Sequence, residues 1–324
     1  MSGADSLFVE APARLHFGVL DLRGDLGRRF GGLGAAVPSP SLQLEASAAG
    51  QVEARGPDAE RAAEFARRFL EHHDIRSGAS IVVHQAIPAH SGLGSGTQLG
   101  LAVARALAEL HGLPADPESL ARAVGRGRRS AIGTWTFALG GFIVEGGRRA
   151  GSEAIAPLLA RYPVPSTWHC VLVVPPGPPG LTGDAEAAAF ERLPRAPERD
   201  VERVAHLVLM QLLPALVEGD LAGFGAALTE IQRITGAWFA AAQGGVFAPG
   251  PSARLVERMS AWGAAGVGQS SWGPAVYGLV EGEDAASALA SRVRAERGGD
   301  GRVFEGGFAT GGARLWRAQK PGRS

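Results

Sequence analysis

The segment that most constrains the fold is a glycine-rich loop placed between a short apolar strand and a long apolar helix. Residues 87–101 read IPAHSGLGSGTQLGL, so glycines alternate with other residues along the loop. Residues 98–111, QLGLAVARALAELH, are apolar almost all round, which predicts a helix buried beneath a sheet. Backbone amides of such a loop, together with the helix N-terminus, attract an anion. The predicted phosphate-binding residues are Ser91, Gly92, Gly94, Ser95, Gly96 and Thr97.

The glycine pattern of this loop also bears on other kinds of site. It matches neither the P-loop pattern of nucleotide hydrolases nor the glycine pattern of dinucleotide-binding domains, so neither of these sites is indicated. A plain strand-to-helix turn also uses glycine and serine and is the remaining alternative.

Strand and helix patterns alternate in the first half of the chain, and helices dominate the second half. An irregular segment at 175–183, PPGPPGLTG, follows an apolar strand that ends at Val174. We therefore predict an α+β protein with two domains, residues 1–163 and 164–324. The predicted strands cover 7–22, 42–54, 80–86, 275–280 and a short stretch near Val303. The predicted helices cover 57–73, 98–111, 201–218, 221–242, 253–262 and 284–296.

Composition excludes several classes of function. The 32 basic and 32 acidic residues give a formal net charge of zero, which argues against nucleic acid as a partner. Cys170 is the single cysteine, so no internal disulfide forms and a reducing compartment is favoured. No apolar stretch is long enough to span a bilayer, and the N-terminus lacks a signal-peptide pattern. These features predict a soluble, cytoplasmic protein.

Six blocks of sequence carry a resemblance to a known family. Pro88, Gly92, Leu93, Gly94 and Ser95, at the start of a long helix, resemble the phosphate loop of the GHMP kinase superfamily. Within it, the chain is similar to the β-ribofuranosylaminobenzene 5'-phosphate synthases. The blocks are RLHFGVLDL (14–22), GGLGAAV (31–37), PAHSGLGSGTQ (88–98), RRSAIGTWTFALGGFIVEGG (128–147), PPGPPGLTGDAEAAAF (175–190) and GVGQSSWGPAVYGL (266–279).

This resemblance implies a two-domain GHMP-kinase-like fold, with a ribosomal S5-like α/β domain followed by a ferredoxin-like α+β domain. It also implies a decarboxylating phosphoribosyl transferase of tetrahydromethanopterin biosynthesis, within one-carbon metabolism. Such an enzyme joins phosphoribosyl pyrophosphate to 4-aminobenzoate, or to 4-hydroxybenzoate, and releases pyrophosphate and CO2. Mg²⁺ bound to the diphosphate is the expected cofactor, with no protein ligands assigned, and a homodimer is the expected assembly.

The chain departs from the kinases of this superfamily at their usual general base. Those kinases place an aspartate shortly before a Gly-Gly pair, whereas residues 130–139, SAIGTWTFAL, contain no acid before Gly140 and Gly141. A site without this base suits bond formation through a cationic carbon better than removal of a hydroxyl proton. The alternatives are an ATP-dependent small-molecule kinase and a catalytically inactive ligand-binding module.

The segment Arg14-Leu15-His16-Phe17-Gly18 is predicted to lie on a strand, where Arg14 and His16 share one face. Arg14 would bind a carboxylate or phosphate, and His16 would move a proton or hydrogen-bond the aromatic substrate. A structural histidine and a surface arginine are the alternative. Asp21 is the third catalytic candidate, and it would otherwise cap the turn at Arg23 and Gly24.

The remaining candidates are predicted to contact substrate. Arg28 and Arg29 precede a glycine segment at 31–34 that we interpret as a turn, and Arg128 and Arg129 end a dense arginine run that also contains Arg126. Trp272 offers a flat face for an aromatic ring or a developing cation. The full set is Arg28, Arg29, His90, Arg128, Arg129, Gln269, Ser270 and Trp272, with Thr182 as a weaker candidate.

Overall fold

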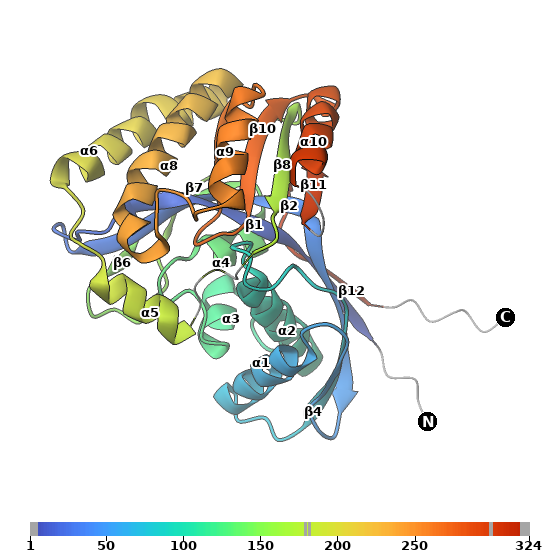
Figure 1. The fold of residues 1–324 in the computed structure, drawn as a ribbon. Helices are drawn as coiled ribbons and strands as arrows, with labels where there is room; N and C mark the ends of the chain where they lie inside the picture. Colours follow the sequence, from blue (N-terminus) through green and yellow to red (C-terminus); the bar gives the residue numbers. More distant parts are fainter. Residues whose placement is uncertain (1–5, 178–179, 181–182, 298–300, 318–324) are drawn as a thin grey trace.

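The computed structural model describes residues 6–177, 180, 183–297 and 301–317. Its strands form two sheets, one of eight strands and one of four (Figure 1). The large sheet is built on two long antiparallel strands, β1 (Leu7–Asp21) and β2 (Arg28–Ala49). Its other strands are β3 (Glu53–Arg55), β4 (Gly78–Gln85), β5 (Phe142–Glu145), β6 (Arg148–Arg149), β7 (Leu158–Tyr162) and β12 (Arg314–Arg317).

Strand β2 corrects one prediction. Residues 31–34 do not form a turn, because they lie within β2 and residues 32–34 pair with β1 on one side and with β5 on the other. The turn between the two long strands lies earlier, and Gly27 N–H donates to the Gly24 carbonyl there. The glycines of β2 have another role. Where a strand carries glycine, no side chain covers the backbone, so side chains from neighbouring elements can lie over the strand.

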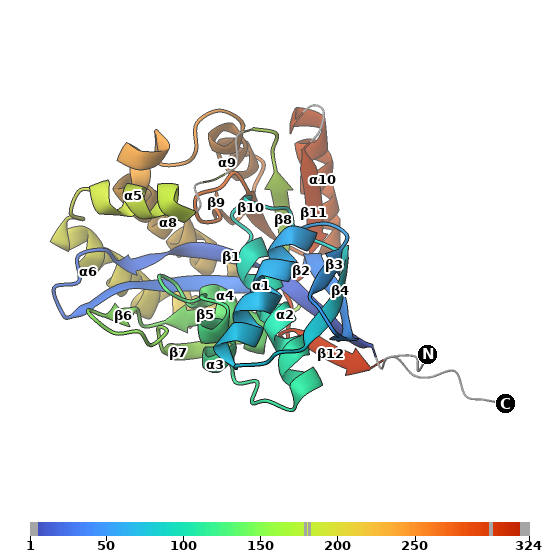
Figure 2. The same ribbon diagram turned by 90° about the horizontal axis from the view of Figure 1, so that it is seen from below.

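Four helices lie on one side of β1 and β2, below the two strands in Figure 1 and in front of them in Figure 2. The helix after the glycine loop begins three residues earlier than predicted, at Ser95, so Ser95, Gly96 and Thr97 form its first turn. It is buried against β1 and β2, as expected for an apolar helix. The four are α1 (Ala59–His72), α2 (Ser95–His111), α3 (Pro117–Ala123) and α4 (Ile132–Leu139).

The second sheet has the order β11-β8-β10-β9, all antiparallel, and packs with the helices that follow residue 197 above β1 and β2 in Figure 1. Its strands are β8 (Trp168–Val174), β9 (Gly266–Gln269), β10 (Val276–Glu281) and β11 (Arg302–Gly306). The helices of this half are α5 (Gly183–Arg192), α6 (Glu198–Leu207), a π-helical turn (Val208–Leu212), α7 (Leu213–Glu218), α8 (Leu221–Gln243), α9 (Pro251–Ala261) and α10 (Glu283–Arg297).

The predicted α+β class and the two-domain organisation are confirmed. The predicted boundary after residue 163 falls between β7, which ends in the large sheet, and β8, which begins the small one. The chain nevertheless returns to the large sheet, where β12 pairs with β1. In the part of the chain that the structure describes, no helix combines the length and apolarity needed to cross a membrane.

Candidate active site

Two adjoining cavities lie where the glycine loop, β1 and the helices of the second half meet. One has a volume of about 360 Å³ and is lined by the glycine loop, and we call it the loop cavity. The other, about 290 Å³, is lined by His16 and several aromatic side chains, and we call it the aromatic cavity. Their shared walls make them one continuous site. The shared lining residues are Arg14, Thr97, Arg126, Arg129, Glu186, Ser271 and Trp272.

The glycine loop wraps closely around its neighbours. Gly92 and Gly94 have positive φ angles of 82° and 77°, which favour glycine. A Cβ atom on Gly92 would lie 2.1 Å from the Ser270 carbonyl oxygen, and one on Gly94 would lie 2.8 Å from Cγ of Arg14. Arg14 in turn donates a hydrogen bond from its guanidinium to the Gly92 carbonyl. The loop conformation therefore depends on glycine and holds Arg14 at the cavity wall.

Two further arginines approach the first turn of α2. A Cβ atom on Gly96 would lie 2.5 Å from Nη2 of Arg61 and 3.1 Å from Nη2 of Arg126, so both guanidinium groups are close to this turn. The first N–H groups of a helix have no intrahelical partner and point toward any anion at its N-terminus. Three arginines and a helix N-terminus thus surround the loop cavity, which makes it suited to phosphate.

Burial leaves two of these arginines poorly solvated. Desolvation lowers the pKa of Arg14 to about 10, and the Glu186 charge partly opposes this shift. Desolvation, followed by repulsion from Arg61 and Arg68, lowers the pKa of Arg126 to about 10 as well. Nε of Arg126 is buried and finds no hydrogen-bond acceptor among the described residues. A bound anion would supply the compensation that both cations lack.

His16 lies on β1 on the same side as Arg14, at the wall of the aromatic cavity, while Leu15 and Phe17 are fully buried in the core. Its Nε2 is 3.2 Å from Oγ of Ser130, and its backbone N–H donates to Oγ of Ser270 at 3.0 Å. Burial, and then the positive charge of Arg14, lower the pKa of His16 to about 3. The imidazole is therefore neutral at physiological pH and acts as a hydrogen-bonding group rather than as a cation.

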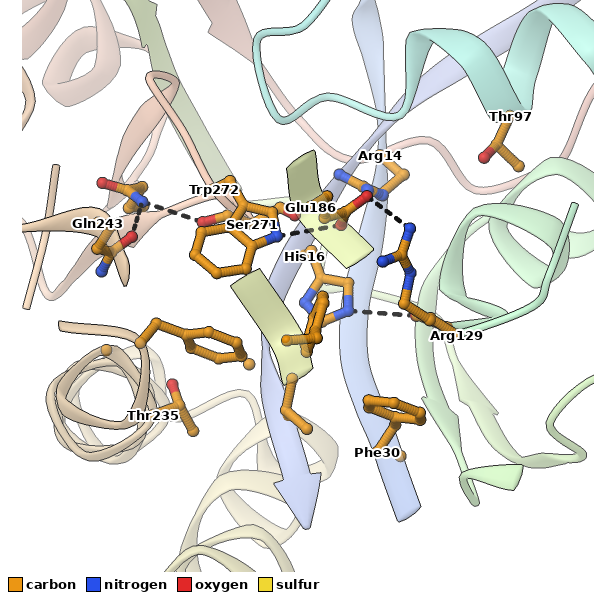
Figure 3. A pocket seen from close by; sticks show the side chains of 18 of the residues that line it. Arg14, His16, Phe30, Thr97, Arg129, Glu186, Thr235, Gln243, Ser271 and Trp272 are labelled. Carbon is orange, nitrogen blue, oxygen red and sulfur yellow. Dashed lines mark hydrogen bonds and ion pairs between the residues drawn. The ribbon is translucent and has the colours of Figure 1, made fainter. Parts of the chain in front are cut away.

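Five Phe and Trp side chains from several elements line the aromatic cavity, and Figure 3 labels two of them, Phe30 and Trp272. Trp272 packs edge-on against Phe239, with centroids 5.0 Å apart, and against Phe190, at 5.5 Å. Glu186 bridges this group to the loop cavity, because its carboxylate accepts from Nε1 of Trp272 at 3.0 Å and pairs with Arg129 at 2.9 Å. These contacts hold Trp272 in place and leave an apolar space beside it that would accept an aromatic ring.

The structure places the other predicted residues at different distances from this site. His90 lines the loop cavity, Arg128 lines the aromatic cavity, and Arg129 lines both. Gln269 lines the aromatic cavity, but its side-chain oxygen accepts from Ala248 N–H at 2.7 Å and its amide donates to Gln243. Its hydrogen bonds therefore stabilise the loops of the cavity.

Ser270, a predicted substrate contact, lines neither cavity in the described structure. Its hydroxyl donates to the Gly92 carbonyl at 2.7 Å and accepts from the backbone N–H of His16. Ser270 therefore links β1, the glycine loop and the segment after β9 instead of offering a group to substrate.

Asp21, Arg28 and Arg29 line neither cavity either. The Asp21 carboxylate accepts from the N–H groups of Arg23 at 2.5 Å and Gly24 at 3.0 Å, so it caps the turn, as the alternative interpretation held. Arg28 donates to the Gly147 carbonyl at 3.1 Å, and Arg29 to the Leu22 carbonyl at 2.9 Å. The strand pairing of β2 turns both arginines toward the protein backbone. Thr182 lies outside the described residues.

Sequence reasoning missed several residues of the site. Arg61 reaches the glycine loop from α1, a helix that its apolar periodicity marked only as packing. Arg126 was visible in the arginine run, but nothing in the sequence distinguished it from Arg122, which is exposed. Glu145 is fully buried close to His16, although the acid expected before Gly140 is absent. The other missed residues are Ser130, Glu186, Phe190 and Phe239.

The described residues of the site offer few ligands for a metal ion. Among the described residues, no group of three or more His, Cys, Asp or Glu side chains is arranged to hold a metal ion. Of the described residues that line the two cavities, Glu186 alone carries a carboxylate. Mg²⁺ commonly binds through one or two carboxylates, water and substrate phosphates. The donor set is therefore compatible with a magnesium ion that arrives with a diphosphate.

Comparison with family models and known proteins agrees with this architecture. Residues 59–141 match the GHMP kinases N terminal domain, and residues 212–298 match the GHMP kinases C terminal domain. The structure resembles a homoserine kinase from Cytophaga hutchinsonii with a TM-score of 0.72 and 19% identity, covering 98% of this chain and 99% of that one. It also resembles a mevalonate diphosphate decarboxylase from Enterococcus faecalis, with a TM-score of 0.66 and 16% identity over 97% and 99% of the two chains. At these identities the likeness shows the fold alone.

Closer relatives identify the family. The β-ribofuranosylphenol 5'-phosphate synthase of Methanothermobacter thermautotrophicus is 38% identical, covering 95% of this chain and 98% of its own. The protein of the same name from Archaeoglobus fulgidus is 37% identical over 70% of this chain and 76% of its own. The predicted family and fold are confirmed, and the relatives' names specify a phenol where the resemblance had named an aminobenzene. The chain therefore belongs to the β-ribofuranosylphenol 5'-phosphate synthase family, a group of transferase enzymes with the GHMP kinase fold.

Proposed function

We propose that this protein condenses phosphoribosyl pyrophosphate with 4-hydroxybenzoate, releasing pyrophosphate and CO2, and that 4-aminobenzoate is the second acceptor to test. The names of the relatives, which specify a ribofuranosylphenol 5'-phosphate, favour the hydroxylated acid. The observation that carries the proposal is the pair of adjoining cavities, one cationic and one aromatic, with Arg14 and Trp272 in their shared wall. A site of this form suits one phosphorylated and one aromatic substrate side by side.

The reaction balances without a net proton. A bond forms between C1 of the ribose and the ring carbon that bears the carboxylate, while the bond from C1 to the diphosphate oxygen breaks. The bond between the ring and the carboxylate then breaks, and its electron pair restores the aromatic ring as CO2 departs. A site for this chemistry must hold the leaving diphosphate, shield a cation-like sugar carbon and keep the ring within reach of it.

The loop cavity would hold the donor's anionic groups. Arg14, Arg61 and Arg126 stand around the first turn of α2, and their charges would stabilise the diphosphate as negative charge develops on it. Mg²⁺ bound to the diphosphate would neutralise part of this charge, and Glu186 with the hydroxyls of Ser95 and Thr97, which line this cavity, would help to hold it.

The aromatic cavity would hold the acceptor. Trp272, Phe190 and Phe239 provide apolar contact for the ring, while Arg129, 5.2 Å from the Phe190 ring, stands at the shared wall where the carboxylate would enter. Aromatic faces also favour positive charge, so Trp272 would stabilise the developing sugar cation. His16 would meet the opposite, hydroxyl-bearing end of the ring.

The proposal is tested by release of labelled CO2 from carboxyl-labelled 4-hydroxybenzoate in the presence of the sugar donor, Mg²⁺ and purified protein. Parallel reactions contain labelled 4-aminobenzoate, or ATP in place of the sugar donor. Release that requires the sugar donor is expected with 4-hydroxybenzoate. Consumption of ATP with no release of CO2 would instead favour a kinase, and no reaction with any combination would favour a binding module.

Two variants connect this activity to the site. Arg14→Ala removes a half-buried cation from both cavities, and we expect kcat/KM to fall roughly 100-fold, the usual effect of losing one charge-stabilising donor. Ser95→Ala removes a hydroxyl from the first turn of α2 and should lower kcat/KM about tenfold. Circular dichroism should show that both variants remain folded. Unchanged turnover in both would refute this placement of the substrates.

A further inference from the structure

The inference concerns a buried acid that the proposed reaction does not use. Glu145, at the end of β5, is fully buried, and its Oε1 reaches the same position above Gly32 as Nε2 of His16. It accepts from Gly147 N–H at 2.7 Å and from Ala131 N–H at 3.4 Å, and Ser130 also hydrogen-bonds to it. A carboxylate costs free energy to bury, so its position invites a chemical explanation.

Strand β2 brings Glu145 and His16 together. It pairs with β1, which carries His16, on one side and with β5, which carries Glu145, on the other. Gly32 and Gly34 leave the strand bare at this point. A Cβ atom on Gly32 would lie 3.1 Å from Oε1 of Glu145 and 3.5 Å from Nε2 of His16, so a larger residue would occupy the space into which both side chains reach.

Ser130 completes the connection. Its Oγ lies 3.2 Å from Nε2 of His16 and also accepts from Ile132 N–H at 3.3 Å. A hydroxyl has one proton to donate. An ionised Glu145 carboxylate has no proton of its own, so in its hydrogen bond with Ser130 the hydroxyl is the donor. Ser130 must then accept from His16, which places the imidazole proton on Nε2 and leaves the lone pair on Nδ1. Among the described residues no hydrogen-bond partner is found for Nδ1, and Figure 3 shows the ring among the side chains that line the aromatic cavity.

We propose that Glu145, acting through Ser130, makes His16 the proton acceptor for the hydroxyl group of a para-hydroxylated aromatic acid. The substrate hydroxyl gives its proton to Nδ1, the Nε2 proton passes to Ser130, and the Ser130 proton passes to Glu145. The oxygen's electron pair enters the ring and makes the carbon that bears the carboxylate a better nucleophile. After CO2 leaves, the proton returns by the same path, so the net reaction consumes none. His16 is the catalytic residue, and Ser130 and Glu145 are positioning residues.

The electrostatics support this direction of transfer. Desolvation raises the pKa of Glu145, despite the hydrogen bonds from Gly147, Ala131 and Ser130 that oppose the rise, so the carboxylate accepts a proton more readily than an exposed one. Arg14 is the charged group that disfavours a cationic His16. A chain that passes the proton onward avoids a lasting imidazolium beside Arg14. The inference rests on the proposed function and adds to it the activation of the acceptor.

The test uses Glu145→Gln and two acceptors, 4-hydroxybenzoate and its 3,5-difluoro derivative, whose hydroxyl ionises at lower pH. Loss of the relay should lower kcat for 4-hydroxybenzoate about 100-fold, within the usual range for general base catalysis, with KM nearly unchanged. The hydroxyl of the fluorinated acid ionises without a strong base, so the variant should lose less activity with this acceptor. The fold-decrease in kcat should be smaller than with 4-hydroxybenzoate by a factor of about ten or more. In the variant, kcat for 4-hydroxybenzoate should rise with pH toward the ionisation of its own hydroxyl, a dependence that wild type should lack. Glu257→Gln, at an exposed position on α9, is the matched control.

Every result of this experiment either supports the proton relay or overturns it. Wild-type kcat in Glu145→Gln, or an equal loss with both acceptors and no new pH dependence, would overturn the relay, because a purely structural role predicts equal losses. If Glu145→Gln fails to fold, Ser130→Ala keeps the carboxylate and cuts the connection, and the same two readouts apply. Wild type that releases no CO2 from either acceptor would overturn the proposed function and the relay together, whereas active wild type with an unaffected variant overturns the relay alone.

Discussion

Acid should destabilise the folded protein through His16, and the size of the effect follows from its burial. The pKa of His16 falls to about 3 in the folded protein from 6.5, the value expected in the unfolded chain. The unfolded state therefore binds the proton first as pH falls. The stabilising contribution is complete above about pH 6.5 and is lost progressively between about pH 6.5 and 3. From pH 7.5 to 5.0 the loss amounts to about 2 kcal/mol of unfolding free energy.

The assay compares urea unfolding of wild type and His16→Gln at these two pH values, followed by tryptophan fluorescence. Glutamine retains hydrogen-bonding groups but cannot titrate, so the variant should lose about 2 kcal/mol less than wild type over the same interval. Other titrations are common to both proteins and cancel in the comparison. His84→Gln, at an exposed site on β4, controls for the loss of a histidine as such and should follow wild type. Equal losses in wild type and His16→Gln would show that His16 is not held neutral.

Three further substitutions test the glycine loop, the Trp272 ring and the role of Asp21 as a turn cap. Gly92→Ala would place Cβ 2.1 Å from the Ser270 carbonyl at a positive φ, so kcat/KM should fall at least about tenfold, whereas Gly151→Ala, with open space around it, should retain activity in the same assay. Trp272→Ala removes the ring beside the acceptor, and steady-state kinetics should show KM for the aromatic acid rising about tenfold while KM for the sugar donor changes little. Asp21→Ala should keep kcat/KM within about threefold but lower the unfolding free energy by about 1 kcal/mol, measured by urea titration, because it loses only a turn cap. A large loss of turnover in Asp21→Ala would restore it as a catalytic candidate.

Local sequence was sufficient for the parts of the site that lie on one element. The glycine loop, the helix that follows it and the alternation of Arg14 and His16 against Leu15 and Phe17 all depend on neighbours within a few residues. Their positions in the structure agree with the periodicity. Arg28 and Arg29 were placed beside a turn because a glycine segment in the middle of a long strand has the composition of a turn. Asp21 caps the turn at Arg23 and Gly24, which the sequence had offered as its alternative role.

The sequence alone therefore determined the class and the family, and it predicted the segment for phosphate, because these follow from short patterns and from the order of the predicted elements along the chain. Only the tertiary structure decided which distant groups meet. Arg61 and Arg126 reach Gly96 from two other elements, and Glu145 meets His16 because the strand between them carries glycine instead of a side chain. These contacts arise from strand pairing and helix packing. The positions of the residues along the chain do not indicate which of them will lie close together.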